Sequence, residues 1–370
     1  MQPTIYLALT HDWELRGDGS GDIEAIQFAP LRRLLEIYAK CGVRTTILPD
    51  LMQQIRFRQL EVEHPELKPH ADSWDEQVRE AFRQSHDIQL HLHPQWLNAD
   101  YQDGRWRPNG DWSILNYERD AAYSMLAAGK EYLETLLQPI DSSYRCLAFR
   151  AGALAAAPSD HLLRSLAALG IQLDVSLAAG VFVNNDKLQL DYRNCEETFA
   201  PFYPAMEDAR RVSRQREEIV CIPLNHFHGS RREVTRQNLA LARQQLASSS
   251  KGQANHAPTG SKSNRPFRIG LAFEKLIMPA LQRKHFVSDT GRLNYPLMRE
   301  MLASIRQRAR DSGLTQIPVV LTNHPKDIRD FPAIERFVSE AAQAEDIRFI
   351  TLNEIAAKIK SGEFQVRTAE

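Results

Sequence analysis

Short apolar segments alternate with helical patterns along most of the 370 residues, and this alternation restricts the fold more than any other feature. The predicted strands, rich in β-branched and aliphatic residues, cover 4–10, 42–48, 87–93, 146–152, 171–177, 218–225, 317–324 and 347–352. The helical patterns between them cover about 29–39, 51–84, 117–137 and 159–169. Such alternation predicts a parallel sheet with helical crossovers. Seven or eight strands in this length favour an α/β barrel over an open sheet.

The overall balance of residues is that of a globular protein. Hydrophobic residues make up 43% and charged residues 25%, with a net charge of -1, which argues against nucleic acid or an anionic membrane surface as the partner. No apolar run approaches the roughly 18 residues of a membrane span. The start, "MQPTIYLALTHDW", lacks a basic region, so no secretory signal is expected. The four scattered cysteines are interpreted as free thiols, and the expected location is cytoplasmic.

One segment departs from the alternation. Residues 248–265, "SSSKGQANHAPTGSKSNR", are polar and without periodicity, and they predict a mobile surface insertion in which His256 is solvated. The stretch 271–279, "LAFEKLIMP", is interpreted only as a helix or strand edge. Because no repeat and no second boundary is visible, we expect a single domain over residues 1–370. The pattern gives no oligomeric state.

Titratable side chains collect where the predicted strands end, which is where a barrel keeps its active site. These residues are Asp12, Glu14, His91, His93, Arg150, Asp174, His226, His228 and His324. Their grouping is more informative than any one of them, because the bodies of the same strands are apolar.

The spacing of His91 and His93 suits a metal ion. Residues i and i+2 of a strand point to the same face about 6.6 Å apart, since each residue advances about 3.3 Å. A carboxylate from the neighbouring strand end, Asp12 or Glu14, would complete a catalytic set of two histidines and one acid. The alternative interpretation is that His91 and His93 are two ordinary polar residues on one face of a strand. His226 and His228 repeat the spacing but lack an acidic companion, so they better suit the rim of a substrate pocket.

The order of these motifs resembles the polysaccharide deacetylase family (NodB homology, carbohydrate esterase family 4), as a divergent member. The resemblance rests on "THDWE" (10–14), "RTTIL" (44–48), "HDIQLH" (86–91), "FRAG" (149–152), "LDVS" (173–176) and "LTNHP" (321–325). It implies a distorted (β/α)7, TIM-like barrel and a divalent-metal hydrolase. Two departures stand out. The family's adjacent Asp-Asp pair is here Asp12-x-Glu14, and the second histidine comes two residues after the first instead of four, with Gln95 at the usual place.

The resemblance implies a role for each strand-end residue. Glu14, His91 and His93 would hold a divalent ion such as Zn²⁺, and Asp12 would take the proton from water, although Asp12 and Glu14 could exchange roles. Arg150 would orient Asp12 by a bidentate ion pair. His324 would protonate the departing amine, with a carboxylate holding its ring.

Substrate contacts are expected around this centre. Trp96 and Trp112 lie in loops that would crown the site, where indoles stack on sugar rings, and Asp174, His226 and His228 complete the predicted substrate-binding set. The expected substrate is a small or saccharide molecule, and the expected reaction is removal of an N-acyl group, such as acetyl, in surface polysaccharide biosynthesis. Two alternatives stay open: a metal-free, sugar-binding pseudoenzyme, and an amidase for a non-sugar amide, as in allantoinase-like relatives.

Overall fold

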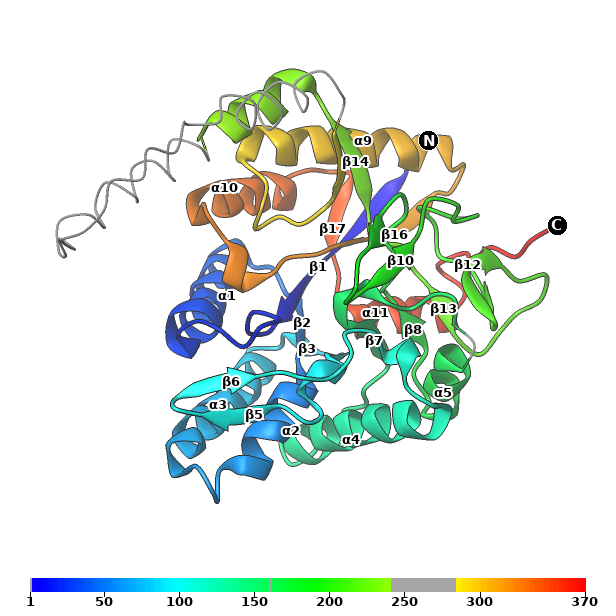
Figure 1. Ribbon diagram of the computed structural model, residues 1–370. Helices are drawn as coiled ribbons and strands as arrows, with labels where there is room; N and C mark the ends of the chain where they lie inside the picture. Colours follow the sequence, from blue (N-terminus) through cyan, green and yellow to red (C-terminus); the bar gives the residue numbers. More distant parts are fainter. Residues whose placement is uncertain (1, 160, 241–283) are drawn as a thin grey trace, which may run out of the picture.

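The computed structural model describes residues 2–159, 161–240 and 284–370, and Figure 1 shows its helices lying around the outside of the central strands. The predicted insertion 248–265, with His256, and the stretch 271–279 lie outside the described residues. The central strands are β1 (Thr4–Trp13), β2 (Thr46–Pro49), β3 (Asp87–Ile88), β4 (Leu90–Leu92), β7 (Ala148–Ala151), β8 (Leu173–Asp174), β13 (Val220–Cys221), β16 (Gln316–Leu321) and β17 (Ile347–Phe349).

These strands form two parallel sheets. The first has the order β16–β1–β2–β3, with β17 also paired to β1, and the second has the order β13–β8–β7–β4. Isolated parallel bridges join the two: Asp50 pairs with His91, and Leu224 pairs with Val320. β1 is almost wholly buried, as expected for a parallel strand covered on both faces. The fold is therefore mixed α/β with parallel pairing, as the alternation predicts.

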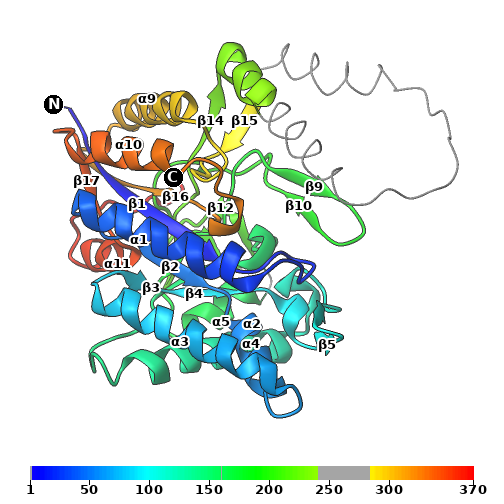
Figure 2. The same ribbon diagram turned by 90° about the vertical axis from the view of Figure 1, so that its left-hand side faces the viewer.

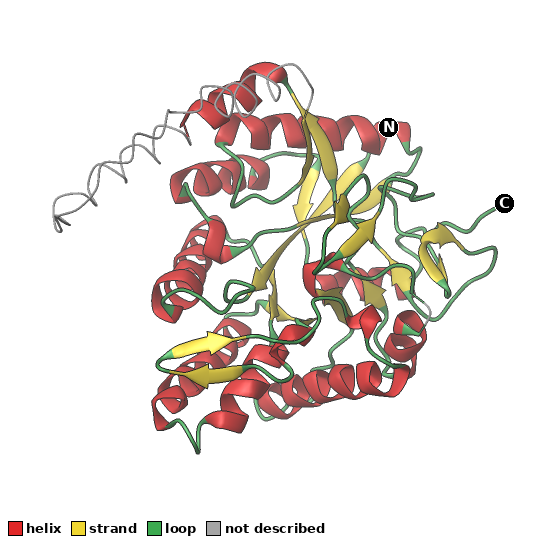
Figure 3. Ribbon diagram, viewed as in Figure 1, coloured by secondary structure: helices red, strands yellow, loops and turns green. Residues whose placement is uncertain are grey.

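Helices cover the outer faces of the strands (Figures 2 and 3), and most of them bury an apolar stripe. The helices are α1 (Ala29–Cys41), α2 (Leu51–Leu60), α3 (Lys68–Arg83), α4 (Arg119–Leu137), α5 (Leu162–Ala168), α9 (Tyr295–Asp311), α10 (Phe331–Ala342) and α11 (Leu352–Lys360). In α1 the buried residues Leu31, Leu34, Leu35 and Tyr38 follow the helical period, and Gly42 ends the helix with a left-handed φ of 65°.

Four antiparallel strand pairs accompany this frame and were not predicted. They are β5 (Asp100–Gln102) with β6 (Arg105–Arg107), β9 (Phe182–Asn184) with β10 (Gln189–Asp191), β11 (Pro204–Ala205) with β12 (Asp208–Val212), and β14 (His226–Gly229) with β15 (Lys284–Val287). His226 and His228 therefore lie on an antiparallel ribbon. The parallel pairing ends just before them, at the bridge between Leu224 and Val320.

Two boundaries also differ from the predictions. The segment predicted as one strand at 87–93 is interrupted between β3 and β4, and its last residue, His93, precedes the 3₁₀ turn η3 (Pro94–Trp96). The segment predicted as a strand at 347–352 already ends at Phe349, because Thr351 and Glu354 form a reciprocal capping box that starts α11.

The remaining general expectations concern thiols and the membrane. All four cysteines lie in the described ranges and are free, with Cys146 and Cys221 buried. Among the described residues, no helix combines the length and the apolar character that crossing a bilayer requires.

Candidate metal centre and active site

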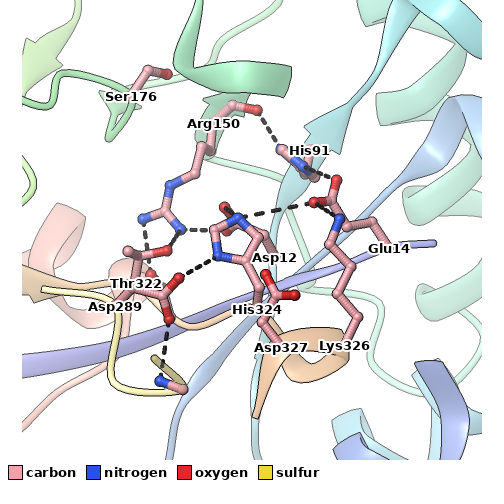
Figure 4. Close-up of polar contacts among 12 residues, drawn as sticks. Asp12, Glu14, His91, Arg150, Ser176, Asp289, Thr322, His324, Lys326 and Asp327 are labelled. Carbon is pink, nitrogen blue, oxygen red and sulfur yellow. Dashed lines mark hydrogen bonds and ion pairs between the residues drawn. The ribbon is translucent and has the colours of Figure 1, made fainter. Parts of the chain in front are cut away.

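The ends of several parallel strands bring the predicted residues together, as Figure 4 shows. Glu14 directly follows β1, and His91 lies in β4 beside Arg150 of β7, its register partner. His324 follows the end of β16 and precedes the 3₁₀ turn η6 (Pro325–Asp327). Because parallel strands share one carboxyl edge, residues distant in sequence meet at that edge.

Glu14, His91 and His93 form the centre of the cluster. Glu14 Oε2 lies 3.2 Å from His91 Nε2 and in direct contact with His93 Nε2. The three side chains are buried, and one ligand atom from each lies within 4.8 Å of the others. Glu14, and not Asp12, is the carboxylate that faces both imidazoles.

The backbone fixes how the two imidazoles point. His91 Nδ1 lies 2.8 Å from the carbonyl oxygen of Arg150, a bond in which the ring donates, so Nε2 is left toward Glu14. The amide N–H of His93 donates to Asp50 Oδ1 at 3.0 Å, and His93 Nδ1 lies 3.1 Å from Gln95 Nε2. His91 therefore presents Nε2 to the centre with its other nitrogen already engaged, as metal-ligating histidines do.

Charges around Glu14 show what the centre attracts. Burial by itself would raise the pKa of Glu14, but His93 and Lys326 outweigh it and hold the pKa well below its usual range. Lys326 Nζ lies 2.6 Å from Glu14 Oε1 and 2.9 Å from the carbonyl oxygen of Leu15. Burial opposes a charged His91, yet the hydrogen bond to Glu14 and the charge of Asp12 raise the pKa of His91 to about 9. The centre favours positive charge.

Asp12 and Arg150 form a buried ion pair behind the centre. Arg150 has no exposed side-chain surface, and its Nη1 contacts Asp12 Oδ1. Its other nitrogens donate to Thr10 Oγ1 at 2.8 Å and to the carbonyl oxygen of Val175 at 3.1 Å. The predicted pairing exists, but the bidentate geometry is wrong, because Nη2 and Nε bind these other acceptors. Burial acts to raise the pKa of Asp12, but the charges of Arg150, His91 and His324 together outweigh it and leave the pKa lowered.

His324 lies between two carboxylates. Its Nδ1 is 2.9 Å from Asp289 Oδ2, and its Nε2 is 3.5 Å from Asp12 Oδ2 and 3.9 Å from Glu14 Oε1. Burial favours the neutral ring, but the charge and hydrogen bond of Asp289 raise the pKa of His324 above its usual value. The contact with Asp289 therefore favours the protonated form of the His324 ring.

Three side chains of this region were not predicted from the sequence: Asp50, Asp289 and Lys326. Asp50 immediately follows β2, and Asp289 lies two residues after the end of β15. Both are therefore titratable residues at strand ends, like those that were predicted. Lys326 follows His324 by two residues in η6. Asp50 lies two residues past the predicted strand 42–48, so extending the search by two residues would have found it.

Several predicted substrate contacts lie elsewhere. Trp96 is 1% exposed, with its ring packed edge-on against Phe57 and Trp106, so a sugar cannot stack on it and that prediction is wrong. Asp174 is wholly buried in β8, where Ser176 and the Cys221 thiol donate to it.

The β14–β15 ribbon holds the other two predicted contacts. His226 and His228 each face His285, with ring centroids 5.0 and 5.3 Å apart. No described contact joins them to the Glu14 cluster.

The donor set fits a divalent ion. Two imidazole nitrogens and one carboxylate oxygen are the ligands of catalytic zinc sites, which leave a coordination position open. Within the described ranges, Glu14, His91 and His93 are the group of three whose ligand atoms converge in this way. Asp50 adds a buried carboxylate oxygen, Oδ2, without a hydrogen-bond partner.

Comparisons with known proteins place the fold. No family model and no curated protein matches the chain. A solved structure described as a polysaccharide deacetylase from Mycobacterium smegmatis has a TM-score of 0.50 and 15% identity, covering 100% of this chain and 95% of that one. A GH57-type branching enzyme from Pyrococcus horikoshii has a TM-score of 0.49 and 11% identity, covering 100% of this chain and 72% of that one. PuuE allantoinase has a TM-score of 0.47 and 11% identity, covering 97% of this chain and 91% of that one. The resemblance to polysaccharide deacetylases is therefore supported at the level of the fold.

Proposed function

We propose that this protein is a metal-dependent hydrolase that removes an N-acyl group, in the first instance acetyl, from an amino sugar or saccharide precursor. The observation that carries the proposal is the convergence of Glu14, His91 and His93 at the ends of β1 and β4. The fold likeness to the Mycobacterium smegmatis structure supports it.

The same proposal includes the architecture. The two parallel sheets would form one (β/α)7 barrel in a single domain over residues 1–370, with the strand order β16, β1, β2, β3–β4, β7, β8, β13. The bridges Asp50–His91 and Leu224–Val320 support it, because the first joins the end of β2 to β4 and the second joins the segment after β13 to β16. The site would then lie at the carboxyl end of the barrel.

The chemistry follows from the positions of the side chains. A divalent ion, zinc by its ligands, would polarise the acyl carbonyl and lower the pKa of water from 15.7 to about 7. Glu14, His91 and His93 would hold it. Asp12 is the proton acceptor that the resemblance implies, kept ionised by Arg150. His324, held by Asp289, would donate a proton to the departing amine nitrogen.

A saccharide substrate is supported by Trp112, which the sequence analysis placed over the site. Gly17, three residues after Glu14, lies against its ring, because a Cβ on Gly17 would approach Trp112 to 2.7 Å. The Lys187 ammonium from the β9–β10 hairpin lies 5.3 Å from the same ring. Trp112 is partly exposed and takes the place of Trp96 as the proposed aromatic contact.

A metal-free sugar-binding protein is the second candidate, and one contact favours it. Lys326 Nζ lies 2.6 Å from Glu14 Oε1, so the Glu14 carboxylate has a positive partner even without a metal ion. The two candidates differ in whether the purified protein contains a divalent ion.

Metal analysis with an acyl-release assay tests the proposal. We expect about one divalent ion per chain, acetate release from N-acetylhexosamine compounds, and loss of activity with a chelator that added zinc restores. A chain without bound ion that still binds saccharides would overturn the hydrolase in favour of the second candidate. Release from small cyclic amides alone would exclude the sugar substrate.

Replacing His324 with glutamine is expected to lower the rate by roughly 10²–10⁴, because a general acid typically contributes that much. The ion content should stay unchanged. In Asp289→Asn the loss should be smaller, and the alkaline limb of the pH–rate profile should move to lower pH. Asp289 raises the pKa of His324, so without it the ring loses its proton earlier as pH rises. An unchanged alkaline limb in Asp289→Asn would contradict this role.

A further inference from the structure

Lys326 brings a positive charge into direct contact with a proposed metal ligand, and the proposed chemistry does not use it. It lies in the turn η6, two residues after His324, and its side chain is only 12% exposed. In Figure 4 this side chain extends from the turn to Glu14. Lysine is rarely buried to this extent, because its ammonium loses water and needs protein partners instead.

Two partners fix the position of the ammonium. Lys326 Nζ lies 2.6 Å from Glu14 Oε1 and 2.9 Å from the carbonyl oxygen of Leu15, the next residue along the chain. The amide N–H of Leu15 in turn donates to Gln53 Oε1 at 3.1 Å, so α2 anchors the same peptide segment from its other side. The lysine therefore occupies a prepared position beside Glu14.

The two oxygens of Glu14 have separate partners. Oε2 lies 3.2 Å from His91 Nε2 and in direct contact with His93 Nε2. Oε1 binds Lys326, and the nearest imidazole nitrogen of His324 is 3.9 Å away from it. A free carboxylate can offer a metal ion either one oxygen or two. In this arrangement only Oε2 faces the two imidazoles, so Lys326 and an ion can share Glu14 without competing for the same oxygen.

We propose that Lys326 reserves Glu14 Oε1, so that Glu14 offers a divalent ion the single oxygen Oε2; this inference rests on the proposed function. Arg150 and Arg292, which also lie near the centre, are paired with other carboxylates. A second Glu14 oxygen on the ion would fill a position that catalytic zinc sites keep open for water and substrate. Lys326 is therefore a positioning residue that keeps this position open.

Lys326→Met is the informative variant, because methionine has a similar length but neither the charge nor the donor. Two effects on zinc affinity oppose each other. Losing an outer group that orients a ligand typically weakens metal binding by about 10–100-fold. Losing a positive charge close to the ion strengthens binding, and this effect should dominate because charges in a buried site are weakly screened. We therefore expect zinc to bind roughly tenfold more tightly, whereas acyl release should fall by roughly 10–100-fold.

Two further measurements do not depend on activity. Cobalt(II) can replace zinc, and its visible absorption weakens as the number of its ligands rises. Cobalt-loaded Lys326→Met should absorb more weakly than cobalt-loaded wild type, because Oε1 joins the ion. Without metal, Lys326→Met should melt several degrees lower, since the buried Glu14 carboxylate loses its lysine partner. Lys326→Arg keeps the charge and should move all four quantities back toward wild type.

Lys130→Met is the matched control. Lys130 is a partly buried lysine of α4 that pairs with Glu134, and the two side chains are 18% and 20% exposed. This variant should melt slightly lower, but its zinc affinity, cobalt spectrum and acyl release should match those of wild type.

Each contrary result overturns the inference. Weaker zinc binding by Lys326→Met would show that the lysine only orients Glu14. An unchanged cobalt spectrum would show that Oε1 stays away from the ion without the lysine. Unchanged acyl release or metal-free melting temperature, or a Lys326→Arg variant that behaves like Lys326→Met, would also contradict the role. A wild type that binds zinc but releases no acyl group removes the proposed function alone, and one that binds no ion removes both.

Discussion

His91→Ala and His93→Ala are each expected to abolish stoichiometric binding of a divalent ion and, with it, acyl release. Each change removes one of three converging ligands and leaves Glu14, which is 5% exposed, with one imidazole fewer. The rate should fall by at least about 10³, because the ion supplies several kcal/mol and each 1.36 kcal/mol is tenfold. Elemental analysis after dialysis and competition with a chromophoric chelator measure the ion directly.

His226→Ala is the control for this experiment. It removes a histidine with the same i, i+2 spacing, on the β14–β15 ribbon, whose described contacts do not reach Glu14. Ion content and activity should both stay near wild type. If His226→Ala lost the ion as completely as His91→Ala, the assignment of the metal centre to β4 would be wrong.

The main strands were predictable because a parallel strand is buried on both faces and shows as an apolar run. β1 and β16 lie where such runs occur, and their pairing brings polar strand ends to one edge. The spacing of His91 and His93 was also readable. His93 lies beyond β4, but its backbone is still extended, with φ -113° and ψ 106°, so the two rings meet on one side.

The remaining residues of the site could not be predicted, because their positions depend on contacts that sequence periodicity does not show. Asp50 follows Pro49 in "TTILPD" and lies in the gap between the predicted strand (42–48) and the predicted helical pattern (51–84), so neither prediction included it. Asp289 reaches His324 because it forms a parallel bridge with Thr322, which is distant in sequence and lies two residues before His324. Lys326 is a charged residue in a short turn, where the ordinary expectation is solvation. The positions of all three side chains depend on partners that are distant in sequence.

The wrong assignment of Trp96 has the same cause. A tryptophan after Pro94 reads as a loop residue, but Phe57 of α2 and Trp106 of β6 enclose its ring. Neither contact is local in sequence. Short-range patterns identified residues at strand ends, and they could not show which aromatic rings the added hairpins would cover.

Arg150→Met is expected to give the largest loss of stability among the site variants, about 3–5 kcal/mol in free energy of unfolding. Arg150 and Asp12 are both buried, and removing one partner leaves the other charge uncompensated. The variant also frees the acceptors Thr10 Oγ1 and the Val175 carbonyl. Urea denaturation followed by circular dichroism, with Arg150→Lys as the charge-conserving comparison, measures the loss.

A second substitution separates charge from packing. Asp12→Asn in the Arg150→Met background removes the orphaned carboxylate, so it should recover part of the lost stability, whereas the same change in wild type should destabilise. The pH dependence gives an independent check. Arg150 holds the pKa of Asp12 below its usual value, so the pair stabilises the fold above about pH 4 and loses that contribution as pH falls. The gap in unfolding free energy between wild type and Arg150→Met should therefore be fully present near pH 7 and should narrow as the pH falls below about 4. A gap independent of both pH and Asp12 would mean that Arg150 acts through packing and its hydrogen bonds, and not through its charge.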